Sequence, residues 1–254
     1  MAITKSHPTS GIKITEPSTK GAAEIPKYQS AISTKKVGGG AIELRAYIFL
    51  DRMQPQLASQ LAAVARGYLP IVGQASIFVE IAPGIEINRL TDIAVKTTDV
   101  MPGDQVVERA FGMLEFHHMD QGMVRQSGQA ILDALEKSES DRLQPRILTS
   151  QLVRRIHDYQ AQLVNRTSRS ANLLLPGETL YILEVHPAGY TAFAANEAEK
   201  ASHIKIIEVR SVGAFGRLYF CGEERDVEVG MAAVHRALES VTGRDNSPRS
   251  AERA

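Results

Sequence analysis

Two clusters of ionisable residues are the first candidates for chemistry in this chain. Glu115, His117 and His118 stand close enough together to suggest a metal site. Strand alternation turns Leu114 and Phe116 inward and leaves Glu115 and His117 on the outer face. No Cys or third His follows at ligand spacing. We therefore expect a solvated strand face here and no metal or other cofactor.

His157 and Asp158 resemble a catalytic pair only because they are adjacent, and no Ser or Cys nucleophile motif accompanies them. The single Cys221 lies in an apolar stretch and cannot form an intrachain disulfide, so we expect a buried, unreactive thiol in a reducing cytoplasmic compartment. The residues predict no enzyme.

A different signal comes from two short segments that each join two strand-like stretches. They are Glu108-Arg109-Ala110-Phe111-Gly112 and Val212-Gly213-Ala214-Phe215-Gly216. Only the first carries charge. The simplest interpretation is an ordinary solvated turn, and the alternative is a functional loop that exists in a charged and an uncharged version.

These segments belong to an internal repeat in which twelve pairs of positions match at a constant offset of 104 residues. The pairs are Leu44/Leu148, Gly73/Gly177, Glu80/Glu184, Pro83/Pro187, Ala94/Ala198, Lys96/Lys200, Val100/Ile204, Ala110/Ala214, Phe111/Phe215, Gly112/Gly216, Leu114/Leu218 and Phe116/Phe220. No gap is needed from the first pair to the last. We treat a second similarity, between residues 51–55 and 141–145, as chance. The repeat predicts two domains, at 41–140 and 141–242.

Apolar periodicity assigns the same elements to each repeat: strand, helix, strand, helix, a pair of strands, helix. In the first repeat the strands include 41–50 and 77–81, and a short helix covers 88–98. Helical stripes are formed by Leu57, Leu61, Val64 and Ala65, by Val124, Gly128, Ile131 and Leu135, and by Val227, Met231, Val234, Leu238 and Val241. Pro83 and Pro187 fall between a strand and a helix. The mixture predicts an α/β (α+β) fold.

Composition limits the possible partners. Lys plus Arg equals Asp plus Glu at 29 each, so no overall charge favours nucleic acid or an anionic membrane. No apolar run approaches the roughly 20 residues that cross a bilayer. Residues 1–40 are polar and Lys-rich and end in Gly38-Gly39-Gly40, which predicts a disordered extension with a flexible joint. The polar residues 243–254 predict a flexible tail.

The two Gly-containing loops, together with Ala-Asn-Glu-Ala-Glu-Lys at 195–200, resemble the tandem, circularly permuted shell proteins of bacterial microcompartments, specifically those of the alpha-type carboxysome. The likeness covers about residues 42–242. It implies small antiparallel sheets with packed helices, and a homotrimeric, pseudohexagonal tile among hexameric shell proteins, with trimers that can stack.

The resemblance also implies roles for individual residues. Residues matching Glu108 and Arg109 gate a wide central pore, and Val212 and Gly213 hold the same place in the second repeat. A trimer would therefore alternate three charged loops with three small ones, and a ring of Arg favours anions. We expect Glu108 and Arg109 to point to opposite sides of an extended segment. The expected solutes are ribulose bisphosphate and phosphoglycerate.

Lys96 and Lys200 match the lysine that this family places at the edge between tiles. The usual small-pore loop, Lys-Ile-Gly-Ser-Gly, is absent, so small-pore selectivity does not carry over. Residues 1–40 suggest a contact with other shell or interior proteins. Two alternatives remain open: a soluble metabolite-binding regulatory protein built of duplicated α/β domains, and, less favoured, an enzyme.

Overall fold

The computed structural model describes residues 41–168 and 172–247. The expectations for residues 1–40, including the glycine joint, lie outside the described residues. Each half of the described chain has the predicted order of strand, helix, strand, helix, two strands and helix. The elements of the first half are β1 (Glu43–Leu50), α1 (Pro55–Ala62), β2 (Ala75–Ala82), η1 (Gly84–Glu86), α2 (Ile87–Thr97), β3 (Met101–Glu108), β4 (Phe111–His118) and α3 (Gln121–Ala134).

After a short turn η2 (Glu139–Asp141), the second half repeats the pattern. Its elements are β5 (Arg146–Val153), α4 (Asp158–Thr167), β6 (Thr179–His186), α5 (Tyr190–Ala201), β7 (Lys205–Arg210), β8 (Gly216–Gly222) and α6 (Glu224–Glu239). The two antiparallel sheets have strand orders β1-β2-β4-β3 and β5-β6-β8-β7. The duplicated α/β (α+β) fold that the repeat predicts is confirmed.

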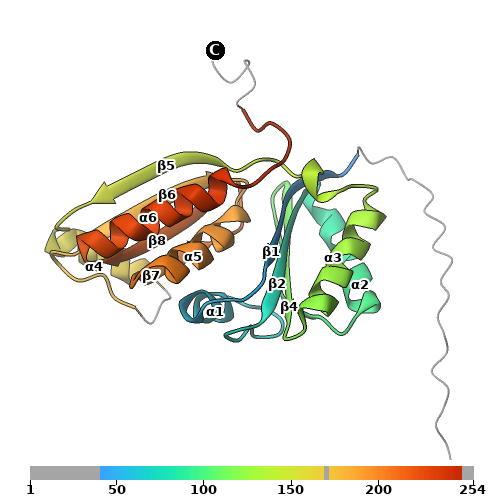
Figure 1. The fold of residues 1–254 in the computed structure, drawn as a ribbon, viewed down its shortest axis with the longest axis horizontal. Helices are drawn as coiled ribbons and strands as arrows, with labels where there is room; N and C mark the ends of the chain where they lie inside the picture. Colours follow the sequence, from blue (N-terminus) through green and yellow to red (C-terminus); the bar gives the residue numbers. More distant parts are fainter. Residues whose placement is uncertain (1–40, 169–171, 248–254) are drawn as a thin grey trace, which may run out of the picture. The chain divides into compact units, whose positions relative to one another are not determined.

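One face of each sheet is covered by two helices, and every second residue of a strand points toward this face. In the first half α2 and α3 lie together on this face, and in the second half α5 and α6 do so (Figure 1). Leu114 and Phe116, predicted to point inward, are fully buried beneath α2 and α3 with Ile77 and Val79. The alternation therefore predicts the inner face correctly.

The register of the strands shows where the repeat holds and where it breaks. Ile77 pairs with Phe116 in the first sheet, and Tyr181 pairs with Phe220 in the second, at the constant offset of 104. A β-bulge lies between Leu44 and Ala46, and the matching bulge lies between Ile147 and Thr149, which is an offset of 103. Leu44 therefore corresponds to Ile147, so the predicted match with Leu148, and the gap-free alignment, are wrong. The offset changes to 104 between the first residue of α4 and the first residue of β6.

The halves share one core. Ala46, Ile48, Leu50, Phe78 and Met113, on the second face of the first sheet, belong to the same buried cluster as α5 and the helix-covered face of the second sheet. The N-terminus of α1 also docks on α5, where the Glu199 carboxylate accepts hydrogen bonds from the backbone amides of Gln56 (2.8 Å) and Leu57 (3.0 Å). This contact joins unlike surfaces of the two repeats.

Three smaller predictions need correction. The first helix ends at Ala62, so Val64 and Ala65 lie beyond it, and Val64 is exposed. Residues 243–247, part of the expected flexible tail, are hydrogen bonded: Arg244 donates its amide to the Arg142 carbonyl at 2.7 Å. Leu135 caps α3 rather than lying inside it.

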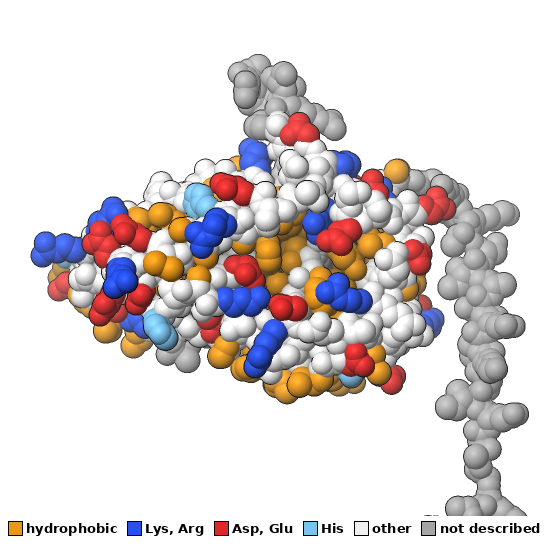
Figure 2. All heavy atoms as spheres, in the orientation of Figure 1, with side chains coloured by type: hydrophobic (Ala, Val, Ile, Leu, Met, Phe, Trp, Pro, Cys, Tyr) orange, Lys and Arg blue, Asp and Glu red, His pale blue; other side chains and the backbone are white. Residues whose placement is uncertain are grey.

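On the face shown in Figure 2, Lys and Arg side chains are interspersed with Asp and Glu, as expected from the balanced composition. No helix in the described part of the chain combines the length and apolar character needed to cross a membrane.

Candidate pore loops

The first predicted loop is a tight turn between β3 and β4. Glu108 ends β3 and Phe111 begins β4, so Arg109 and Ala110 alone make the turn, and both are exposed. Arg109 has a φ of 54°, in the left-handed region. The expectation of an extended segment at Glu108-Arg109 is therefore wrong, because a two-residue connection between antiparallel strands requires positive φ angles.

The second loop is longer and turns at a glycine. It runs from Ser211 to Phe215 between β7 and β8, and Gly213 has a φ of 103°. Gly213 is the equivalent of Arg109, so both repeats need the left-handed region at this position. A glycine adopts it freely, whereas an arginine is strained by about 1–2 kcal/mol.

The glycines that end both motifs have a role in packing. Gly112 and Gly216 are buried at the first residues of the second strand of each pair. A Cβ on Gly112 would clash with the carbonyl oxygen of Gly84, and one on Gly216 would clash with Thr191 and the Ala188 carbonyl. Each glycine lets β4 or β8 approach the turn that follows Pro83 or Pro187. The motif is therefore partly a requirement of the fold.

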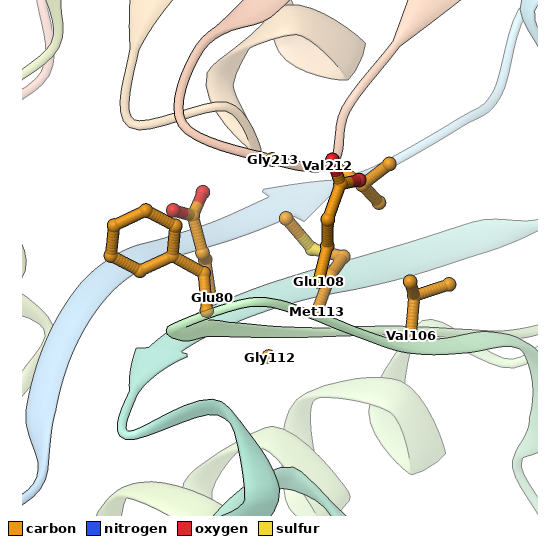
Figure 3. Close-up of a pocket in the computed structure, with 8 residues that line it drawn as sticks. Glu80, Val106, Glu108, Gly112, Met113, Val212 and Gly213 are labelled. Carbon is orange, nitrogen blue, oxygen red and sulfur yellow. The ribbon is translucent and has the colours of Figure 1, made fainter.

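The two loops meet within one chain. The Glu108 carboxylate reaches from β3 toward Val212 and Gly213 (Figure 3), and a Cβ added to Gly213 would lie 3.2 Å from its Oε1 atom. Arg210 approaches the same Oε1 at 3.9 Å. A small cavity lies between the loops, lined by Glu80, Val106, Glu108, Phe111, Gly112, Met113, Val212 and Gly213. The guanidinium of Arg109 makes no hydrogen bond or ion pair with any described residue.

A buried polar network beneath the loops was not predicted. Arg45, which is 5% exposed, donates from Nε to Glu80 Oε1 at 2.8 Å and from Nη2 to His186 Nε2 at 2.9 Å. Its guanidinium carbon lies 3.7 Å from the centroid of the Phe111 ring. The ring of His186 in turn makes an edge contact with Phe215. The one sequence signal was an Arg among the apolar residues of β1.

Burial and the positive charges of Arg45 and Arg146 lower the pKa of His186 to about 4. Burial raises the pKa of Glu80, and Arg45 and the Gly189 amide, which donates to Oε2 at 2.8 Å, oppose that shift. The Arg45 guanidinium can only donate hydrogen bonds, so His186 Nε2 must accept this one and therefore carries no proton.

The two predicted edge lysines occupy the last turns of α2 and α5, but their surroundings differ. Lys96 is 65% exposed and pairs with Asp92 at 2.7 Å on its own helix. Lys200 is 33% exposed and pairs with Glu197 at 2.8 Å and with Asp51 of the first half at 3.2 Å. Lys96 is the freer cation of the two.

The cluster of Glu115, His117 and His118 is not a solvated strand face. Glu115 and His117 do not face solvent as predicted: they are 3% and 0% exposed, and Ser76 Oγ donates to Glu115 Oε1 at 2.5 Å. The prediction is wrong because the segment at Gly67 and Tyr68 hydrogen bonds to Pro102 and Gly103 of β3, next to the Glu115 and His117 side chains. His118 Nδ1 accepts the Asp120 amide.

His157 caps α4 by accepting the Tyr159 amide at 3.2 Å, and Asp158 is the first residue of that helix. Cys221 is buried, as predicted, and burial raises the pKa of its thiol to about 12. Within the described ranges, no group of three His, Cys, Asp or Glu side chains is arranged to hold a metal ion.

Known proteins share this architecture. Residues 44–141 match the family described as the CsoS1D N-terminal domain. The chain is 52% identical over 205 residues to the carboxysome shell protein CcmP of Synechococcus elongatus, a match that covers 81% of this chain and 96% of the relative. Two solved structures are similar over their whole length.

The first is a fused permuted hexameric shell protein from the RMM microcompartment, with a TM-score of 0.77, 42% identity, and coverage of 80% of this chain and 99% of that one. The second is a double ringed trimeric shell protein from the same microcompartment, with a TM-score of 0.78, 35% identity, and coverage of 81% and 100%. The relatives are named as shell proteins, and the duplicated fold agrees with the two solved structures. The chain therefore belongs to the CsoS1D and CcmP family of carboxysome shell proteins and is a structural component of the shell rather than an enzyme.

Proposed function

We propose that this shell protein forms a homotrimeric, pseudohexagonal tile whose central pore is lined by the loops at 108–112 and 212–216 and passes anionic metabolites. The observation that carries the proposal is the meeting of the two loops inside one chain, where Glu108 lies against Gly213. If successive repeats meet in the same way around a ring, all six loops of a trimer converge on its axis.

The surfaces left uncovered support such a ring. Within the chain, α1 docks on α5 through Gln56 and Glu199. The equivalent residues, Tyr159 on α4 and Val95 on α2, are 74% and 41% exposed. Ile85, the equivalent of Gly189, is 65% exposed. Because the contact joins unlike faces, it can continue from chain to chain and close into a ring.

The difference between the loops suits a gate for anions. Three exposed Arg109 side chains would alternate with three Gly213 positions, which leaves room for the arginines to move. A ring of arginines attracts anions of the size of ribulose bisphosphate or phosphoglycerate. Exposed arginines hold such anions weakly, because solvent screens the charge, and weak contacts are a condition for conduction.

The first test is the native mass by light scattering. Three copies of the 27.7-kDa chain give about 83 kDa, and a stacked pair of trimers gives twice that. Either mass supports the tile. A monomer or dimer would remove the axial pore and would favour a soluble metabolite-binding regulatory protein instead.

The gate is tested by imaging the assembled protein with Arg109→Ala. The trimer should persist, and the populations of loop conformers should change because the largest side chain of the loop is gone. Arg155→Ala is the matched control, since Arg155 is also an exposed arginine with a positive φ of 49° but lies outside both loops. Identical loop populations in wild type and Arg109→Ala would refute gating by Arg109.

We also propose that Lys96 and Lys200 contact neighbouring tiles, which include hexameric shell proteins. Lys96→Ala should weaken two-dimensional sheet assembly more than Lys200→Ala does, because Lys200 already pairs with Asp51. Electron microscopy of assembled sheets measures this. Normal sheets from the double variant would dispose of the edge role.

A further inference from the structure

The Arg45 network joins the bases of the two candidate pore loops. Phe111 opens β4 directly after the first loop and stacks on the Arg45 guanidinium, with 3.7 Å from the guanidinium carbon to the ring centroid. Because Arg45 is almost wholly buried, this cation–π contact is among the stronger kind. A displacement of Phe111 therefore disturbs Arg45.

The network continues into the second half. Arg45 Nη2 donates to His186 Nε2 at 2.9 Å, and the His186 ring meets Phe215 edge to face, with centroids 6.0 Å apart. Phe215 is the last residue before β8 and belongs to the second loop. Four residues, Phe111, Arg45, His186 and Phe215, thus form a continuous path from one loop to the other.

Glu80 anchors this path to the scaffold. Its Oε1 accepts from Arg45 Nε at 2.8 Å, and its Oε2 accepts the Gly189 amide at 2.8 Å, directly before α5. The β-bulge between Leu44 and Ala46 places Arg45 in the extra position, which turns a strand residue out of its normal alternation. Arg45 can pivot little, since its charge is paired and buried.

The equivalent positions of the other repeat lack the residues that form this path. The bulge of the second sheet carries Leu148 where the first carries Arg45, and Ala82 stands where the second half has His186. Glu184, the equivalent of Glu80, pairs instead with Arg217 on the surface of its own sheet at 3.2 Å. Leucine and alanine can neither donate a hydrogen bond nor stack as a cation.

We propose that Arg45 and His186 are positioning residues that couple the two pore loops of one chain, so that these loops change conformation together while loops on either side of a chain boundary move independently. The role of the loops as a pore rests on the proposed function above. A trimeric gate built in this way opens in three units, one for each chain, rather than in six.

The test uses the full chain with 4-fluorophenylalanine at position 111 and fluorine NMR. Phe215→Leu changes only the second loop, and in the otherwise native protein it should shift or broaden the fluorine signal of residue 111. In a His186→Ala background the same change should leave that signal unmoved. His203→Ala, at an exposed histidine, is the matched control and should preserve the response.

Arg45→Lys is a second route if His186→Ala fails to fold. Lysine keeps the charge that pairs with Glu80 but lacks the planar fork that reaches His186 and stacks on Phe111, so the response should again be lost. A response that survives in both variants, or that is missing from the wild type, overturns the coupling. Light scattering tests the pore independently of this experiment. A monomeric mass would refute the pore, and the coupling between the two loops could still be tested by NMR.

Discussion

At the scale of single residues, two glycines with positive φ allow the cost of backbone strain to be measured separately from the cost of a side-chain contact. Gly213→Ala and Gly177→Ala both place a side chain at positive φ, 103° and 84° respectively, so each should lower the free energy of unfolding by about 1–2 kcal/mol. Gly177 faces open space, whereas a Cβ at Gly213 meets the Glu108 carboxylate at 3.2 Å.

Gly213→Ala should therefore cost more than its control, and Glu108→Ala should remove the excess. Denaturant unfolding measures this excess loss of unfolding free energy. It compares the two single glycine variants with the Gly213→Ala, Glu108→Ala double variant. Equal losses for Gly213→Ala and Gly177→Ala would show that Glu108 does not rest against the second loop.

His186 should also make the free energy of unfolding depend on pH. Its pKa is about 4 in the folded chain, below the ordinary histidine value of about 6.5, so the unfolded chain binds the proton more readily. The stabilisation is complete above about pH 6.5 and is lost as the pH falls toward about 4.

Unfolding free energies measured from pH 7 down to pH 4 should therefore decline more steeply for the wild type than for His186→Gln. Subtracting one curve from the other cancels the contribution of the carboxylates, which titrate in both proteins. Parallel curves through this range would contradict a neutral, half-buried His186.

At the scale of elements, one carboxylate of α5 contributes to the docking of α1. Glu199 accepts the first free amides of α1, from Gln56 and Leu57, and so acts as an N-cap supplied by the other half. Glu199→Ala should lower the free energy of unfolding by about 1–3 kcal/mol, because two amides lose their acceptor.

Glu197→Ala, on the same helix, is the matched control. It removes an ion pair with Lys200 at 2.8 Å that is partly exposed, which contributes about 0–1 kcal/mol. Thermal unfolding of both variants compares them, and an equal loss would mean that Glu199 does not cap α1.

At the scale of the whole molecule, the proposed seam between chains can be broken without unfolding the chain. Leu163 on α4 is 55% exposed and is the equivalent of Gln60, which bonds the Ile206 carbonyl within the chain. A charge at this position in a buried seam is costly, so Leu163→Glu should convert a trimer of about 83 kDa to the 27.7-kDa chain with unchanged circular dichroism.

Gln162→Glu, one residue away on the exposed side of the same helix, should leave the trimer intact. Light scattering measures the masses of the two variants. A trimer that survives Leu163→Glu would place the seam elsewhere on the chain.

The sequence by itself determined the duplicated fold, the order of elements in each half, and the inward faces of the strands. It did so because the spacing of apolar residues and the repeated glycines and prolines are local requirements of strands, helices and turns. Leu114, Phe116 and Cys221 are buried as their neighbours predicted.

Only the tertiary structure decided which polar residues are buried and which residues meet. Glu115 and His117 looked exposed because a strand's own alternation cannot reveal what packs on its outer face. Arg45, Glu80 and His186 come from three strands and from both halves, up to 141 positions apart, and no sequence spacing connects them. The β-bulge orients Arg45, and its position shows that the repeat is shifted by one residue. Both features depend on strand pairing, which is a long-range property of the folded chain.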